Sequence, residues 1–286
     1  METPPILTDA APVPEAAGPN APIVKRWRWW IHLLVIGVYP LLIGLVGLVF
    51  GEGRGPALSS DAKGLLLVCG EQMVIFGMFF AVAWAASRAS REDLLWRWRP
   101  GIWPVPLGIG YSIALRLGVG ILAGLVVVGL LVARVFTLES LQAFVLTNRP
   151  DVESVVDVPA MRQNPVYFWL TLTVVSFVVA GFREELWRAG VLAGLRVLWP
   201  RAFGSRWGQF AGVAVAAVIF GIGHLGQGVL AVGMTAVLGF GLGAIMVWHR
   251  SIWPAVIAHG MFDATSLALI PWVLERLHEV QRTTGH

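Results

Sequence analysis

Two adjacent carboxylates, Glu184 and Glu185, lie in the otherwise apolar run GFREELWR at 181–188. Ionisable side chains are costly at membrane depth and therefore mark functional candidates. In a helix, Glu184 and Arg188 are four residues apart and face each other, which favours an ion pair that holds this carboxylate in place. Glu185 would then point about 100° away and be free for other work. The alternative is that the segment emerges at the membrane boundary, where the arginines reach water and the glutamates are solvated.

Two histidines follow in later apolar segments. His224 ends the run FGIGH at 220–224, whose glycines let a backbone or a substrate approach closely. A lone histidine near a helix end is more often an ordinary interfacial residue than a ligand. His259 and Asp263 are four residues apart on one helical face, in the run SIWPAVIAHGMFD at 251–263. Such a pair could orient a water, bind a metal, or form a buried hydrogen bond without chemistry.

Together the three segments supply a carboxylate base, imidazoles and a guanidinium, the groups needed to activate water and to stabilise an oxyanion. The sequence has no His-Glu-x-x-His motif of a zinc peptidase and no Gly-x-Ser-Gly nucleophile loop. It also has no pair of aspartates in a Gly-Asp context. The combination of the three segments indicates hydrolytic chemistry more strongly than any one of them alone.

The composition places these segments in a lipid bilayer. Hydrophobic residues make up 57% of the 286 residues and charged residues only 13%, with a mean hydropathy of +0.73. A soluble domain has roughly a quarter of its residues charged. Cys69 is the single cysteine, so no disulfide can form within the chain. The net charge of +4 comes from arginines clustered between apolar runs, which indicates membrane topology and no nucleic-acid partner.

The apolar segments predict an all-α, polytopic integral membrane protein with about seven transmembrane helices, because a spanning helix needs about 20 mostly apolar residues. The third and fourth segments are long enough to tilt or break. The predicted spans are Trp29 to Phe50, Gly64 to Ala86, Trp103 to Val132, Val166 to Gly194, Phe210 to His224, Val229 to Trp248 and Ile252 to Leu274.

The arginine clusters predict the orientation. With the N-terminus in the cytoplasm, four basic clusters fall on the cytoplasmic side, as the positive-inside rule requires. The longest loop, Glu139 to Asn164, falls on the opposite side and could hold a short amphipathic helix. We expect a flexible tail at 1–25 that is retained, a transmembrane domain at 26–278 with its catalytic core at 165–275, and a C-terminal tail at 279–286.

These residues resemble the CPBP or Abi group, the family of CAAX prenyl proteases and bacteriocin-processing enzymes. Its pattern is Glu-Glu-x-x-x-Arg, then Phe-x-x-x-His, then His-x-x-x-Asn or Asp. Phe220 with His224 fills the second motif, and His259 with Asp263 fills the third. The first motif departs from the pattern, because only two residues separate Glu185 from Arg188. Arg188 is therefore one residue early, and its role stays open.

The resemblance implies an intramembrane endopeptidase. By analogy, Glu184 would be the general base that activates water, His224 would help to position the water, His259 and Asp263 would line the oxyanion side, and Glu185 would support the site. The family is classed among metalloproteases, and whether zinc or only glutamate and histidine hold the water stays open. His224, His259 and Glu184 are the candidate zinc ligands. The expected partners are membrane lipid and a peptide or protein with a membrane-associated segment.

Two other functions compete with proteolysis. A non-catalytic membrane protein of the same fold, with an immunity or scaffold role, would explain the displaced arginine as lost activity. A transporter or channel would use Glu71, Arg116, Glu184 and Glu185 as an ion path. Against transport, the polar groups gather at one site, and the sequence has no pair of matching broken helices.

Overall fold

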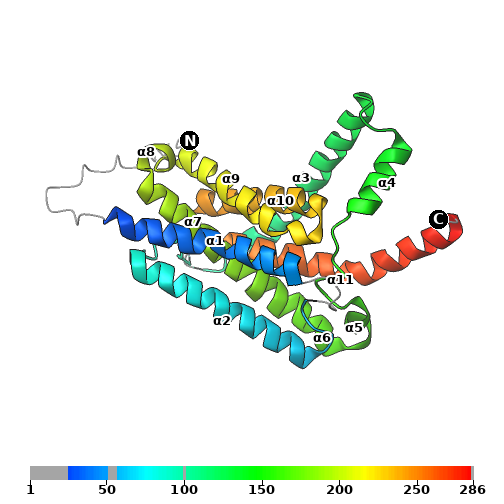
Figure 1. Cartoon of the computed structure of the whole chain (residues 1–286), viewed down its shortest axis with the longest axis horizontal. Coiled ribbons are helices and arrows are strands. Elements are labelled where there is room, and N and C mark those ends of the chain that lie inside the picture. Colours follow the sequence, from blue (N-terminus) through cyan, green and yellow to red (C-terminus); the bar gives the residue numbers. More distant parts are fainter. Residues whose placement is uncertain (1–24, 51–56, 99–100, 285–286) are drawn as a thin grey trace, which may run out of the picture.

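The computed structural model describes residues 25–50, 57–98 and 101–284. Within these ranges the chain is helical and has no strand, which confirms the predicted all-α class (Figure 1). The helices are α1 Arg26–Phe50, α2 Ala62–Ser87, α3 Pro104–Val132, α4 Leu138–Asn148, α5 Val158–Gln163, α6 Pro165–Leu170, η1 Thr171–Phe182, α7 Arg183–Leu198, α8 Pro200–Phe203, α9 Arg206–Gly223, η2 Leu225–Gln227, α10 Val229–His249 and α11 Trp253–Thr284.

Among the described residues, seven helices are long and apolar enough to cross a membrane, in agreement with the seven predicted spans. The fourth span is a continuous rod formed by α6, η1 and α7, from Pro165 to Leu198. The predicted N-terminal tail lies outside the described residues, except for Lys25. At the other terminus, α11 continues to Thr284, past residue 278, where the transmembrane domain was expected to end.

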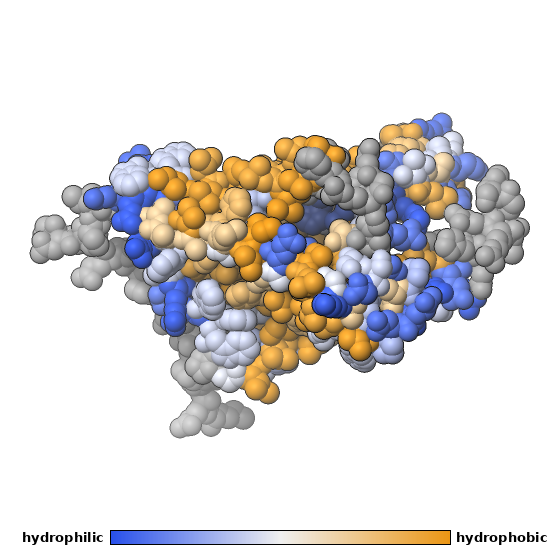
Figure 2. All heavy atoms as spheres, turned by 60° about the horizontal axis from the view of Figure 1, so that its bottom comes forward, coloured by the Kyte–Doolittle hydropathy of each residue, from blue (hydrophilic) through white to orange (hydrophobic). Residues whose placement is uncertain are grey.

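The arginine clusters meet at one end of the bundle, on the left of Figure 1. Arg26 at the start of α1 donates to the Leu198 carbonyl at the end of α7, at 2.7 Å. Arg28 binds the carbonyls of Ala85 and Ala86 at the end of α2. Figure 2 shows hydrophobic residues over the middle of the molecule and hydrophilic residues toward its two ends, as a bilayer requires. Which end faces the cytoplasm stays a prediction.

The long loop lies at the opposite end and contains two helices, α4 and α5, where one short helix was expected. Thr137 and Ser140 form a capping box that starts α4. The segment before α5 is attached to the rest of the protein, because Ala57 N donates to Ser154 O at 2.8 Å. In Figure 1, α4 and the end of α3 project away from the other helices.

The rod from Pro165 to Leu198 is the packing centre of the bundle, with α1, α9 and α11 among its neighbours. Twelve residues of α7 are buried, more than in any other helix for which buried residues are given. Glycines permit the closest approaches between helices. A Cβ at Gly44 of α1 would lie 2.5 Å from Gly223 O of α9, and one at Gly181 of η1 would lie 2.8 Å from Val256 O of α11. The charged run in α7 is thus held rigidly inside the bundle.

Candidate functional site

The two glutamates begin a helix that follows a stretch of π-helix. Residues Thr171–Phe182 form η1, in which each turn is wider than in an α-helix. The Ser176 hydroxyl donates to the Thr171 carbonyl five residues earlier, at 3.0 Å. Regular α-helix resumes at Arg183. Because the π-helix rotates every later side chain relative to a continuous α-helix, η1 determines which faces of the bundle Glu184 and Glu185 reach.

Glu185 and Arg188 form the central ion pair of the site. Their Oε2 and Nη1 atoms are 2.5 Å apart, and both side chains are completely buried. The prediction that Arg188 pairs with Glu184 is therefore wrong, and so is the prediction that Glu185 is free for other work. Positions three and four apart are both neighbours on a helix. Arg188 pairs with Glu185 because both side chains point into the interior of the helical bundle.

The Arg188 guanidinium is enclosed with few acceptors. Its Cζ lies 5.0 Å from the centre of the Phe220 ring. Nε and Nη2 have no hydrogen-bond partner among the described residues. A Cβ at Gly243 would lie 3.0 Å from Arg188 Cδ, so this glycine leaves room for the arginine. A buried cation with so few partners depends strongly on its one carboxylate.

Glu184 instead pairs with the arginine that precedes it. Arg183 Nη2 lies 3.1 Å from Glu184 Oε1, and the two side chains are 13% and 14% exposed. Arg183 Nη1 also donates to Gln72 Oε1 of α2, at 2.7 Å. Arg183 and Gln72 were not among the predicted site residues. The position of Arg183 beside Glu184 was a signal for the first, whereas nothing in the sequence pointed to Gln72.

His259 joins the two glutamates across from α11. Its Nδ1 lies 3.0 Å from Glu185 Oε1, and its Nε2 lies 3.7 Å from Glu184 Oε2. Asp263 Oδ2 is 3.5 Å from the same Nε2. The site thus brings together Glu184, Glu185, Arg188, His259 and Asp263, all five from the predicted set. Asp263 is 28% exposed and is the most accessible side chain of these five.

His224 stands apart from this cluster, at the end of α9. Its Nδ1 hydrogen-bonds to the Phe220 carbonyl at 2.8 Å, and its ring centre is 4.5 Å from that of Phe220. Because a carbonyl can only accept, Nδ1 carries the proton, and the Nε2 of a neutral ring is left with a lone pair. Within the described ranges, no hydrogen bond or ion pair joins His224 to Glu184 or His259. The Phe220 ring, which packs against both Arg188 and His224, is the link between His224 and the cluster.

The described part of the chain contains no group of three His, Cys, Asp or Glu side chains arranged to hold a metal ion. His224, His259 and Glu184 are thus not gathered as a ligand set. Zinc at these residues stays a prediction.

Arg116, for which the sequence predicts no role in proteolysis, connects α3 to α11 beside the site. Its guanidinium donates to Phe262 O and Thr265 Oγ1, and to Ser266 Oγ at 3.2 Å. It also lies 4.3 Å from the centre of the Phe262 ring. Because Phe262 precedes Asp263, Arg116 fixes the turn of α11 that carries this carboxylate. Glu71 is exposed on α2, and its side chain has no hydrogen bond or ion pair in the described part of the chain.

Comparison with known proteins adds one match. Residues 165–265 match the family model described as type II CAAX prenyl endopeptidase Rce1-like. This confirms the resemblance to the CPBP family that the motifs predicted. The matched region extends from the start of α6 into α11 and includes all three motifs, from Glu184 to Asp263. No curated protein and no solved structure matches the chain.

Proposed function

We propose that this chain, whose residues 165–265 match the Rce1-like CAAX endopeptidase family, is an intramembrane endopeptidase. It hydrolyses a peptide bond of a membrane-associated peptide or protein with a water that glutamate and histidine activate. The observation that carries the proposal is the contact of Glu184 with His259, at 3.7 Å, inside a helical bundle with seven candidate spans. Charged groups within membrane spans are energetically costly, so their presence in this bundle indicates a function.

In the proposed reaction, Glu184 is the general base. It takes a proton from water as the water oxygen bonds to the carbonyl carbon of the substrate. The tetrahedral intermediate collapses when the carbon–nitrogen bond breaks, and the proton passes from Glu184 to the leaving nitrogen. The free Nε2 of His224 accepts a hydrogen bond from the same water. His259 and Asp263 lie on the side where the oxyanion develops. Because Nδ1–H of His259 is directed at Glu185, the donor to the oxyanion is Nε2–H of the doubly protonated ring.

The buried pair of Glu185 and Arg188 supports this chemistry indirectly. Glu185 Oε1 faces His259 Nδ1 at 3.0 Å, which fixes the orientation of the ring. Arg188 neutralises the other oxygen of Glu185. An imidazole that is held by a carboxylate presents its second nitrogen in a fixed direction. His259 Nε2 is accordingly held toward Glu184 and Asp263.

The test is cleavage of a fluorogenic membrane-peptide library by the purified full chain in nanodiscs. Glu184→Gln should lower the rate by about 10²–10⁴-fold, the usual contribution of a general base. Glu71→Gln is the matched control, because this carboxylate also lies in a span but has no contact with the site, and its activity should equal that of the wild type. Loss of cleavage in both variants would mean that the effect is not specific to Glu184, and would not assign the general base to this residue.

Zinc is tested separately by measuring the metal content of the purified protein and the effect of a chelator. Zinc would polarise the substrate carbonyl and acidify water if His224, His259 and Glu184 held it. Stoichiometric zinc in the wild type and its absence from His224→Ala would support a zinc site that includes His224. If wild type cleaves every peptide of the library no faster than Glu184→Gln does, the result would support a non-catalytic protein with an immunity or scaffold role.

A further inference from the structure

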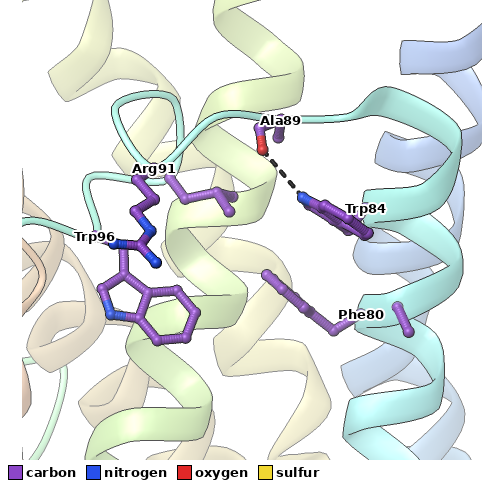
Figure 3. Close-up of a pocket in the computed structure, with 7 residues that line it drawn as sticks. Phe80, Trp84, Ala89, Arg91 and Trp96 are labelled. Atoms are coloured by element: carbon purple, nitrogen blue, oxygen red, sulfur yellow. Dashed lines mark hydrogen bonds between the residues drawn. The ribbon is translucent and has the colours of Figure 1, made fainter.

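A cavity of about 460 Å³ lies at the arginine-rich end of the bundle, between the last turns of α2 and the segment that follows it. It contains none of the residues of the Glu184 site. Figure 3 shows Phe80 and Trp84 on one side of the cavity, and Arg91 and Trp96 on the other. The lining residues are Phe80, Ala81, Trp84, Ala89, Arg91, Leu94 and Trp96.

The wall of this cavity is apolar except at one place. Trp84 Nε1 donates to Ala89 O at 3.1 Å, so the polar atom of the indole is satisfied and its ring is presented to the cavity (Figure 3). Arg91 is the only charged residue of the lining. Its side chain is exposed and forms no hydrogen bond or ion pair with any described residue. Asp93, two residues along the chain, accepts from the Ser90 amide and hydroxyl, each at 2.9 Å, and forms no ion pair with Arg91 within the described ranges.

The depth of the cavity coincides with a boundary between lipid tails and headgroups. Trp84 belongs to the last turn of a candidate span that ends at Ser87. Arg88, just past that end, lies over the Trp84 ring, with 5.0 Å between its Cζ and the ring centre. Arg28 occupies the carbonyls at the end of the same helix. Tryptophan and arginine gather at this level of a bilayer, where apolar and charged groups meet.

We propose that this cavity binds a phospholipid with an anionic headgroup, taken from the leaflet at the arginine-rich end. The acyl region fits the wall of Phe80, Trp84 and Trp96, and the phosphate fits the unpaired guanidinium of Arg91. The volume is within the range of about 300–1,000 Å³ that is usual for ligand sites. Basic side chains beside a span attract anionic lipids. The site is separate from the proposed active site, although the Trp96 and Phe182 rings are in contact with centres 5.6 Å apart.

The experiment measures lipid retention by native mass spectrometry of the full chain, released from nanodiscs that contain equal amounts of phosphatidylglycerol and phosphatidylcholine. Wild type should retain phosphatidylglycerol preferentially. Arg91→Gln should lower this retention about fivefold, because the phosphate loses the one guanidinium of the cavity, whose contribution is about that of a single basic residue beside a headgroup. Ala81→Trp fills the apolar part of the cavity without changing charge and should lower retention as well. Arg201→Gln, an exposed arginine of α8 at the same end, is the matched control and should retain as much lipid as the wild type.

Several outcomes would overturn the proposal. Equal losses in Arg91→Gln and Arg201→Gln would mean diffuse surface attraction without a site. Retention unchanged in Ala81→Trp would mean that no acyl chain enters the cavity. Displacement of the lipid by inorganic phosphate at the same concentration would mean that the site takes a free phosphate. Arg91 and Ala81 are both exposed, so these variants should fold, and gel filtration with circular dichroism verifies this.

Discussion

Arg183 Nη2 lies 3.1 Å from Glu184 Oε1, so the guanidinium beside the proposed base comes from the preceding residue and not from Arg188. Gln72 holds the other side of this guanidinium from α2. Arg183→Gln should therefore lower kcat by about 10²-fold, because small displacements of a catalytic group have effects of this size. KM should change little, since the substrate does not contact Arg183 in the proposed reaction. Steady-state kinetics on a cleaved library peptide measure both constants.

Arg183→Lys keeps the charge but loses the planar fork, and should recover part of the activity. Gln72→Ala removes the second contact and should lower kcat in the same direction by a smaller factor. Full activity in Arg183→Gln would show that Glu184 is positioned by other groups. A loss that appears only in KM would instead place Arg183 at the substrate.

Loss of Arg188 should lower the stability of the fold, because its side chain is paired with Glu185 inside the bundle. Arg188→Met removes the guanidinium partner of the buried Glu185 carboxylate and leaves it only the contact with His259, which should reduce the free energy of unfolding by about 3–5 kcal/mol. The double variant Glu185→Gln with Arg188→Met removes both charges and keeps a hydrogen-bonding group beside His259. It should recover most of the lost stability. Unfolding in mixed micelles measures both values, and a double variant as unstable as the single one would contradict the pairing.

Much of the fold and the site could be predicted from the sequence, because both depend on features that a bilayer makes visible. Apolar runs of sufficient length predicted seven spans, and seven helices of the structure meet the same requirement. Ionisable residues are rare within such runs, so Glu184, Glu185, His259 and Asp263 could be selected from their types alone. Their side chains meet in the structure from two helices, α7 and α11.

The pairing inside the site could not be predicted. Helical spacing allows Arg188 to meet either glutamate, and the choice depends on which side chain the bundle buries. The π-helix at Thr171–Phe182 sets that rotation, and nothing in the sequence had indicated it. The contact between Arg183 and Gln72 joins residues 111 positions apart, so only the packing of α2 against the fourth span reveals it. Arg116 is a similar case, because its acceptors lie on α11.

The two histidines should respond differently to removal. His224 is half-buried, and the one described hydrogen bond of its side chain goes to the Phe220 carbonyl in α9. His224→Ala should abolish most cleavage while it changes the free energy of unfolding by no more than about 0.5 kcal/mol. His259 is buried between three carboxylates, so His259→Ala should reduce both activity and stability. A large loss of stability in His224→Ala would assign this residue a structural role in place of a catalytic one.

The close approach of α1 to α9 should be essential for the bundle, and it can be tested without a substrate. A Cβ at Gly44 would lie 2.5 Å from Gly223 O, one residue before His224, so the two backbones must separate to admit it. Gly44→Ala should therefore lower the free energy of unfolding by about 1–3 kcal/mol, the usual effect of overpacking.

Gly37 lies in the same helix, and a Cβ there would have no atom within 4 Å. Gly37→Ala should consequently raise stability by about 0.5–1 kcal/mol, since alanine restricts the unfolded chain more than glycine does. Unfolding of both variants in mixed micelles gives the comparison. The contact is refuted if Gly44→Ala is as stable as Gly37→Ala. If the two differ as expected, cleavage by Gly44→Ala shows whether the α1–α9 approach also holds His224 in place for the reaction.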